Sequence, residues 1–221
     1  MLMNHLVFTN TKNKYMNKKE IKRLINKENP TIFEIGCADG GDTIEFINTF
    51  VNLNIYCFEP EPKNIALVKN RINYNKHHLF EGVVSDVNGY LNFNRSRTNN
   101  PNDLSYSGSI KKPKEHLSEW PHIKFDDEIT IKSITLDKFC EGNNIGVIDF
   151  IWADVQGAEE NLILGGEKTL NEKVRFLYTE YSNKEYYDGQ ANLSRLLELL
   201  GENWVLINDF GSDVLLMNKT L

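Results

Sequence analysis

Two acidic residues, each at the end of an apolar run, are the groups of this chain best placed to do chemistry. Glu34 lies in the segment T-I-F-E-I-G-C-A-D-G-G (31–41), and Glu59 ends the next apolar run, I-Y-C-F-E. Nucleotide-binding α/β folds have a glycine-rich turn after the first strand and an acid after the second. The glycines let the backbone approach a ligand, and the acid can accept hydrogen bonds from ribose hydroxyls. This pattern predicts a site for a nucleoside-containing cofactor.

The spacing of the glycines indicates which cofactor the turn suits. A dinucleotide site has Gly-x-Gly-x-x-Gly, in which the second glycine admits a pyrophosphate. Ala38 holds that position here, and the turn instead reads Glu-x-Gly-x-x-x-Gly, with glycines at Gly36 and Gly40. An NAD-dependent oxidoreductase is therefore disfavoured. The turn resembles the first motif of class I S-adenosylmethionine-dependent methyltransferases.

Further motifs narrow the resemblance to one family. They read F-E-P-E-P (58–62), E-G-V-V-S-D-V-N-G (81–89), I-T-L-D-K-F (134–139) and I-D-F-I-W-A-D-V-Q-G-A-E (148–159). In this order they resemble the FkbM family of methyltransferases, over residues from about 30 to about 183. The resemblance implies S-adenosylmethionine as cofactor and O-methylation of hydroxyl groups on sugars and natural products. One departure is Trp152, where the family usually has a lysine two residues before the acid, so the role of that lysine is open here.

The resemblance also implies where the cofactor lies. Ligands of open α/β sheets bind outside the carboxyl ends of the strands. In the family, the first loop wraps the methionine part and the acid of the second strand holds the ribose. Ser85 and Asp86 are expected to reach the adenine, and the alternative is that they form a capped turn. The predicted cofactor-binding residues are Glu34, Gly36, Cys37, Ala38, Asp39, Gly40, Thr43, Phe58, Glu59, Pro60, Val84, Ser85, Asp86 and Asp154.

Transfer of a methyl group to a hydroxyl needs alignment and a place for the hydroxyl proton. Asp154, after an apolar run, is the first candidate for base, metal ligand or orienter of the acceptor, and Glu180 is the second. The alternative for Asp154 is a helix cap. Two acids could also hold Mg²⁺ with waters, but no spacing demands it, so a metal is not indicated. His116 and His122 are weaker candidates for the base.

The elements that must position these residues alternate between strands and helices, which predicts βαβ units and a parallel sheet. Strands are expected at 31–35, 54–58, 79–84, 147–153, 174–180, 203–208 and 213–217. Helices are expected at 42–50, 62–72, 158–170 and 191–200. The prediction is a Rossmann-like α/β fold, with a mostly parallel seven-stranded sheet, helices on both faces and the last strand antiparallel. A hairpin-like excursion is expected at Asn88 and Gly89.

The 221 residues suit one methyltransferase domain. Residues 1–28 are expected to form a helical extension, because Ile21, Leu24 and Ile25 share one helical face that would dock onto the sheet. Residues 95–127 lack clear periodicity and are expected to form a variable loop that recognises the substrate or acts as a lid. Tyr106 and Trp120 in that loop could stack on a sugar or anchor the loop to the core.

Composition excludes some partners. The net charge of −6 argues against a general grip on nucleic acid, and no apolar run approaches a membrane span. The three cysteines lack metal or redox spacing, which favours a cytoplasmic protein.

The sequence predicts a sugar or glycan O-methyltransferase. The alternatives are a methyltransferase for another small molecule, nucleic acid or protein, and a non-catalytic nucleotide-binding module. The acceptor and the oligomeric state stay open.

Overall fold

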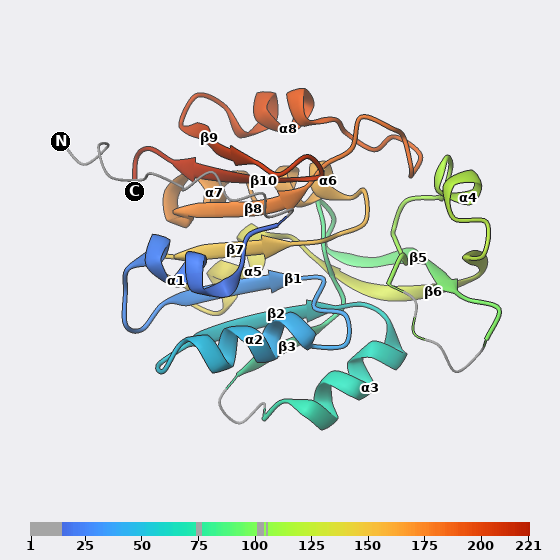
Figure 1. Cartoon of the computed structure of the whole chain (residues 1–221), viewed down its shortest axis with the longest axis horizontal. Helices are drawn as coiled ribbons and strands as arrows, with labels where there is room; N and C mark the ends of the chain where they lie inside the picture. The colour runs from blue at the N-terminus through green and yellow to red at the C-terminus, as the bar shows by residue number, and fades with distance from the viewer. Residues whose placement is uncertain (1–14, 74–76, 101–103, 105) are drawn as a thin grey trace.

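The computed structural model describes residues 15–73, 77–100, 104 and 106–221 (Figure 1). Its main sheet has seven strands in the order β3-β2-β1-β7-β8-β10-β9, all parallel except β10, which runs antiparallel between β8 and β9. The strands are β1 (Thr31–Ile35), β2 (Asn54–Glu59), β3 (His78–Glu81), β7 (Phe150–Ala153), β8 (Phe176–Glu180), β9 (Trp204–Asp209) and β10 (Asp213–Asn218). The predicted Rossmann-like fold class is confirmed.

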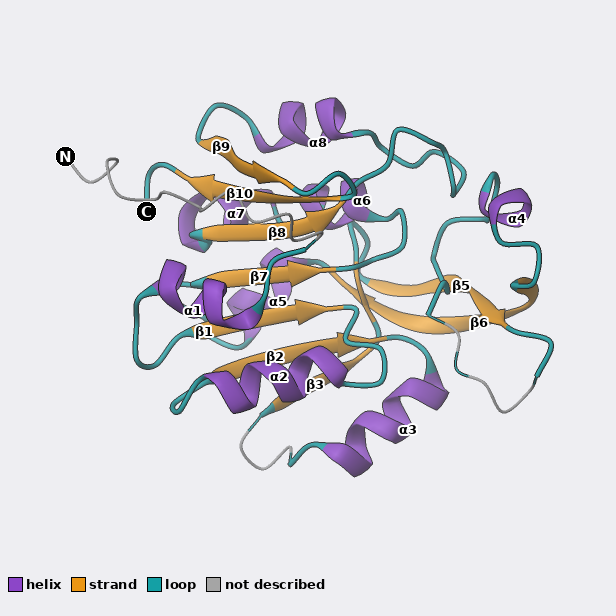
Figure 2. Cartoon of the chain, in the orientation of Figure 1, coloured by secondary structure: helices purple, strands orange, loops and turns teal. Residues whose placement is uncertain are grey.

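Helices cover both faces of the main sheet (Figure 2). One face packs against α1 (Lys18–Ile25), α2 (Gly41–Thr49) and α3 (Pro62–Arg71). The other packs against α5 (Leu136–Gly142), α6 (Glu159–Leu164), α7 (Glu167–Lys173) and α8 (Leu193–Leu200). Successive strand residues point to opposite faces, so Ile32 belongs to the first core and Phe33 to the second.

The helix expected in the N-terminal extension is α1, and it docks onto the sheet as predicted. Asn17 caps it: its side chain accepts hydrogen bonds from the N–H groups of Lys19 and Glu20, and the Glu20 carboxylate accepts from Asn17 N–H. Ile21 and Ile25 are fully buried in the core beneath α2. Residues 1–14 of the expected extension lie outside the described part of the chain.

The strand expected at 79–84 is wrong, because Gly82 divides it between two sheets. β4 (Val83–Val84) belongs to a second, three-stranded sheet of order β4-β6-β5, with β5 (Gly89–Arg97) and β6 (Lys124–Ile134). A Cβ on Gly82 would lie 2.5 Å from the Lys132 carbonyl oxygen, so β6 passes directly against this point. The chain therefore leaves the main sheet at a residue that only glycine can fill.

The hairpin expected at Asn88 and Gly89 is also wrong. β5 pairs antiparallel with β6, and the connection between them includes α4 (His116–Glu119). The segment expected as a loop therefore begins and ends in strands. Of the described residues of β6 only Ile131 and Ser133 are buried, so this strand carries little of the alternation that identifies strands in a sequence.

The helix expected at 158–170 is two helices, α6 and α7, which are separated at Gly165 and Gly166. A Cβ on Gly165 would lie 1.9 Å from the Ser85 carbonyl oxygen. The chain after β4 thus occupies the space that a side chain would need. Helix α5 was not predicted, although Thr135 caps it by accepting a hydrogen bond from Lys138 N–H.

Candidate active site

The carboxyl ends of β1, β2 and β7 point toward the second sheet (Figure 1). Residues from both sides line a cavity at this place. Its empty space is about 710 Å³, counted to its open mouth. Of the predicted site residues, it is lined by Gly36, Ala38, Phe58, Glu59, Pro60, Val84 and Asp154. The opposite wall comes from the second sheet and its connection, through Phe93, Tyr106, Gly108, Ser109 and Ile110. The β5–β6 insertion therefore encloses a site built on the main sheet.

Glu59 is fixed at the cavity wall by two backbone donors and one side-chain donor. Its Oε2 accepts a hydrogen bond from Ala38 N at 2.8 Å, and its Oε1 accepts from Glu61 N at 3.0 Å and Asn64 Nδ2 at 3.2 Å. Burial nevertheless raises the pKa of Glu59 to about 7. The carboxylate thus joins the glycine turn to the end of β2, and it titrates near neutrality.

Gly36 brings the turn and the tip of β7 together. It has φ of 89°, and a Cβ there would lie 1.9 Å from the Asp154 carbonyl oxygen. The N–H groups of Gly36 and Cys37 both donate to the Phe58 carbonyl oxygen, at 2.9 and 3.1 Å. This close approach of three strand ends places Glu59 and Asp154 on the same cavity.

Asp154 and Glu180 form a carboxyl pair. Burial raises the pKa of both groups, that of Glu180 well above its usual range, and a hydrogen bond joins the two side chains. Two adjacent buried carboxylates cannot both ionise without strong repulsion, so they share one proton. Asp154 Oδ1 also accepts a hydrogen bond from Gln156 Nε2 at 2.6 Å, which favours its ionised form. We therefore assign the shared proton to Glu180, which does not itself line the cavity.

Glu34 and Thr43 are brought together on the other face of β1. Thr43 Oγ1 donates a hydrogen bond to Glu34 Oε2 at 2.6 Å, and both side chains are fully buried. Burial raises the pKa of Glu34 to about 8. Cys37 is buried in the same core, beside Cys57. None of these three predicted residues lines the cavity, and their role in cofactor binding stays a prediction.

Asp39 and Gly40 shape the turn from outside the cavity. Asp39 pairs with Arg71 and accepts a hydrogen bond from Gly41 N–H at 3.1 Å. Gly40 has φ of 80° and precedes α2 as its N-cap. Both residues therefore support the loop, and a direct contact with a cofactor is untested.

Ser85 and Asp86 lie on a neighbouring groove, together with Tyr90 and Lys111. Ser85 Oγ donates to Asp86 Oδ1 at 2.8 Å, and Asn161 Nδ2 donates to the same oxygen at 2.9 Å. These hydrogen bonds are typical of a turn that is held in one conformation. The adenine role predicted for the pair stays a prediction, whereas Val84 does line the first cavity.

Asn64 is a cavity residue that the sequence analysis missed. It is 3% exposed, and its Oδ1 has no hydrogen-bond partner among the residues that the structure describes. A buried amide oxygen without a donor is costly unless a ligand supplies one. Ribose hydroxyls carry such donors, so the pair of Glu59 and Asn64 fits the sugar of a nucleoside cofactor. The first turn of the helix after the acidic strand end was the signal that could have identified Asn64.

Trp152 replaces the expected lysine, and the structure supplies a cation from elsewhere. Lys18 of α1 is 5% exposed; its Nζ lies 3.3 Å from the centre of the Trp152 ring and 2.6 Å from Asp42 Oδ1. Trp152 is the cross-strand partner of Glu34, and the Lys18 charge lowers the pKa of Glu34 against the effect of burial. The N-terminal helix therefore provides a buried positive charge next to β1.

Replacing this buried cation should cost stability. Lys18→Met keeps the alkyl chain but removes the ion pair with Asp42 and the contact with the Trp152 ring, and we expect a loss of about 1–2 kcal/mol in the free energy of unfolding. The exposed pair of Lys69 and Glu81 is the control, and Lys69→Met should change stability by less than about 0.5 kcal/mol. Urea denaturation of the three proteins measures both, and equal losses would contradict a special role for Lys18.

Glu34 should make stability depend on pH. Its pKa is about 8 in the folded protein against an ordinary 4.5, so the folded state retains a proton that the unfolded chain releases as the pH rises. This contribution is complete below the unfolded pKa and disappears as the pH rises through the folded one. We expect the free energy of unfolding to fall over this window by about 1.4 kcal/mol per pH unit, and the melting temperature to fall with it.

The variant Glu34→Gln should flatten that fall and should be more stable than the wild type above about pH 8. Glu59 and Glu159, whose pKa burial also raises, contribute to the part of the slope that remains. The exposed Glu45 of α2 gives a matched control, Glu45→Gln, which should follow the wild type. Differential scanning calorimetry across the pH range measures the melting temperatures. Parallel curves of melting temperature against pH for the wild type and Glu34→Gln would refute the role of Glu34.

Three further points raised by the sequence, a histidine base, a metal site and a membrane span, can be compared with the structure. His116 is buried among the rings of Trp120, Phe125 and Tyr187, and burial lowers its pKa. Within the described residues, no three acidic, histidine or cysteine side chains are grouped to hold a metal ion. The helices of the same residues include none long and apolar enough to cross a membrane.

Comparison with known proteins identifies the family. A 2-O-methyltransferase of Sinorhizobium fredii, NoeI, is 39% identical over 209 residues, which cover 92% of this chain and 85% of the relative. Among solved structures, Methanococcus jannaschii fibrillarin is 10% identical with a TM-score of 0.48, over 89% of this chain and 69% of the other. Aeropyrum pernix fibrillarin in complex with S-adenosyl-L-methionine is 13% identical with a TM-score of 0.43, over 93% and 75%.

The family described as the methyltransferase FkbM domain matches residues 34–212, a span that begins at Glu34 and includes Glu59, Asp154 and Glu180. This match covers most of the chain, and the resemblance inferred from the motifs is confirmed. The chain therefore belongs to the FkbM family and is an S-adenosylmethionine-dependent O-methyltransferase.

Proposed function

We propose that this enzyme transfers a methyl group to a hydroxyl of a sugar or glycan, with Asp154 as the base. The observation that carries the proposal is the position of Asp154, which lines the cavity that Gly36 and Glu59 also line. The neighbouring Glu180 carboxyl holds the shared proton, and Gln156 donates to Asp154. Asp154 is thereby kept ready to accept a proton.

In this proposal some residues of the site hold the cofactor, and Asp154 accepts the proton. When bound, S-adenosylmethionine supplies an electrophilic methyl group on its sulfonium. Glu59 and Asn64 hold the ribose side of the site, and the turn at Gly36 holds the backbone close to β7. Asp154 would take the proton of the acceptor hydroxyl, whose oxygen would receive the methyl group that the bound cofactor supplies.

The choice of a sugar rests on two supports. The FkbM resemblance implies hydroxyl acceptors on sugars and natural products, and the relative NoeI is a 2-O-methyltransferase. Tyr106 lines the cavity from the insertion and is 50% exposed, so its ring is available to stack on the apolar face of a sugar.

Three other expectations stay predictions. They are the single domain, the cofactor roles of the remaining predicted residues and the cytoplasmic location.

Two measurements test the proposal in sequence. Calorimetry with S-adenosylhomocysteine should show binding, and its absence at millimolar ligand would remove the cofactor site. Incubation with isotope-labelled cofactor and a panel of monosaccharides, oligosaccharides, nucleosides and phenols follows, with mass spectrometry to detect an added methyl group. Methylation of a sugar hydroxyl is the expected result. Methylation confined to phenols or nucleosides would overturn the choice of acceptor, although it would leave the enzyme class intact.

A further inference from the structure

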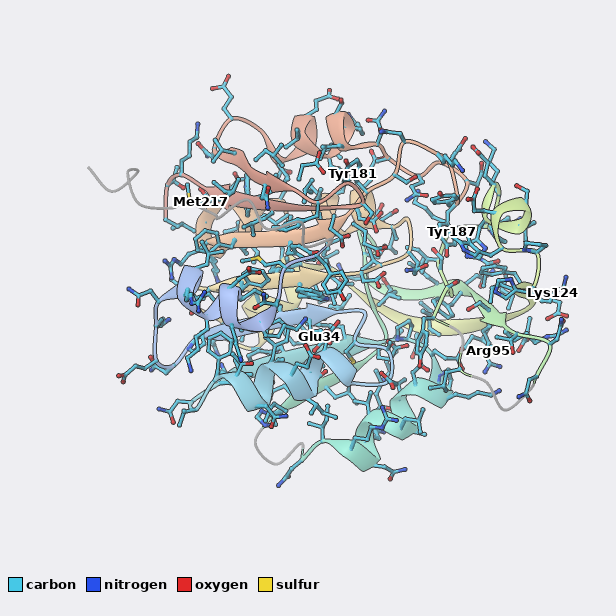
Figure 3. The ribbon with its side chains drawn as sticks, in the orientation of Figure 1. Glu34, Arg95, Lys124, Tyr181, Tyr187 and Met217 are labelled. Carbon is cyan, nitrogen blue, oxygen red and sulfur yellow. The ribbon has the colours of Figure 1, made fainter. Side chains whose placement is uncertain are left out.

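Tyr187 lies in a hydrogen-bond chain that leads to Asp154. The Tyr187 hydroxyl is 2.8 Å from Gln156 Oε1, and Gln156 Nε2 is 2.6 Å from Asp154 Oδ1. Tyr187 is 3% exposed and comes from the segment between β8 and α8, beyond the carboxyl ends of the main sheet (Figure 3). Tyr187 thus reaches the candidate base through one side-chain amide and without touching the cavity itself.

The chemistry of these groups fixes the direction of the chain. An ionised carboxylate only accepts hydrogen bonds, so the amide nitrogen of Gln156 must face Asp154. The amide oxygen then faces Tyr187, whose hydroxyl must donate to it. Without that donor, the amide oxygen would lose its hydrogen bond from Tyr187, and the orientation with the nitrogen toward Asp154 would become less favourable. The Tyr187 proton therefore selects the amide orientation that favours an ionised Asp154.

The backbone of Gln156 is held as firmly as its side chain. Gln156 has φ of 52°, a left-handed conformation that is uncommon for a residue with a side chain. Its carbonyl oxygen accepts a hydrogen bond from Ser109 Oγ at 2.7 Å, and a Cβ on Gly157 would lie 2.7 Å from the Tyr187 ring. The Tyr187 hydroxyl also lies 2.8 Å from the carbonyl oxygen of Ser107, so its single proton is shared between that carbonyl oxygen and the Gln156 amide oxygen. The β5–β6 insertion and the β8–α8 segment thus meet at one residue.

We propose that Tyr187 and Gln156 are positioning residues for methyl transfer, which orient the Asp154 carboxylate toward the acceptor hydroxyl and keep it ionised. This inference rests on the proposed role of Asp154 as the base. Ser109 contributes by holding the Gln156 backbone, so the insertion that encloses the cavity also sets the geometry of the base. Neither Tyr187 nor Gln156 was among the residues predicted from the sequence.

The surroundings of Asp154 explain why one donor matters. The acidic groups that face it are Glu180 of β8, Glu159 of α6, Asp213 of β10 and Asp42 of α2. Burial raises the pKa of Asp154, as do the charges of Asp213 and Asp42, and the hydrogen bonds from Gln156 and Glu180 oppose the rise. Lys111 acts on Glu159 with a favourable charge. Loss of the Gln156 donor should therefore move the pKa of Asp154 upward.

The decisive variant is Tyr187→Phe, which keeps the ring against Gly157 and removes only the hydroxyl. We expect kcat to fall roughly 10- to 100-fold, with little change in affinity for S-adenosylhomocysteine. The acidic limb of the kcat–pH profile should also move to higher pH. Tyr15→Phe is the matched control, because Tyr15 is largely exposed ahead of α1 and its loss of a hydroxyl should leave both quantities unchanged. Gln156→Met, which keeps the chain length but not the amide, should reproduce the Tyr187→Phe result.

A readout without turnover separates this inference from the proposed function. Carboxyl ¹³C NMR of the protein, with the Asp154 signal assigned from Asp154→Asn, should give a higher Asp154 pKa in Tyr187→Phe and in Gln156→Met than in the wild type. An unchanged Asp154 titration in either folded variant would overturn the inference, even if no acceptor has been found. A wild type that binds S-adenosylhomocysteine but methylates no hydroxyl would instead count against the proposed function alone.

Discussion

Asp154→Asn should lower kcat for methyl transfer by about 100- to 10,000-fold, because general-base catalysis contributes on that scale. The substitution keeps the size of the side chain and an oxygen that can accept from Gln156 Nε2. It removes the group that takes the acceptor proton. Affinity for S-adenosylhomocysteine should fall less than about tenfold, because Glu59, Asn64 and the glycine turn are unchanged. Single-turnover kinetics with a sugar acceptor and calorimetry with the product measure the two effects separately.

A matched control for this variant is Asp126→Asn. Asp126 forms a surface pair with Arg97 on the second sheet, so its loss should leave kcat within about twofold of the wild type. Retention of more than about a tenth of the wild-type kcat in Asp154→Asn would show that orientation alone suffices. The acceptor would then lose its proton to water or to another group, and Asp154 would act as an orienter.

Most strands of the main sheet and the glycine turn could be predicted because both depend on local patterns. The apolar runs before Glu34, Glu59 and Asp154 are buried strands, and the glycines after Glu34 match the backbone conformations found there. The rule that ligands bind at the carboxyl ends of parallel strands then placed Glu59 and Asp154 on one cavity. These predictions needed no knowledge of distant contacts.

The sequence was a poorer guide to the direction of side chains at the strand ends. It did not show to which face of the sheet such a side chain points. Glu34 lies one residue before Ile35 and two before Gly36, both of which line the cavity, yet its own side chain points to the opposite face. Successive residues of a strand alternate, so an error of one residue in where the strand ends reverses the assignment. The fully buried runs of a parallel sheet do not reveal which face carries the ligand.

The second sheet escaped prediction because its pairing is long-range. Strand β6 is mostly exposed, and its register with β5 depends on a connection that includes α4. The cavity wall formed by Phe93 and Ser109 follows from that pairing, as does the contact of Ser109 with Gln156. A short local window contains none of this information.

The variant Glu59→Gln should weaken binding of S-adenosylhomocysteine by about 100-fold at about pH 8, since charge-assisted hydrogen bonds are the strong ones. The ribose hydroxyls of the ligand donate best to the ionised carboxylate. Because the pKa of Glu59 is about 7, wild-type affinity should rise as the pH increases through neutrality. The glutamine variant has no such group to titrate, so its affinity should be nearly independent of pH in that range. Calorimetry at several pH values measures both the loss and the slope.

Glu81 provides the control, because it ends β3 directly beside Glu59 in the sheet but does not line the cavity. Glu81→Gln should retain both the wild-type affinity and its rise with pH. A pH slope that persists in Glu59→Gln would transfer the titration to another buried acid, with Glu159 the first alternative because its pKa is also about 7. A flat wild-type profile would mean that the Ala38, Glu61 and Asn64 donors already hold Glu59 ionised in the free enzyme. The ribose would then meet a carboxylate whose charge is constant, and binding would depend on the geometry of the turn rather than on pH.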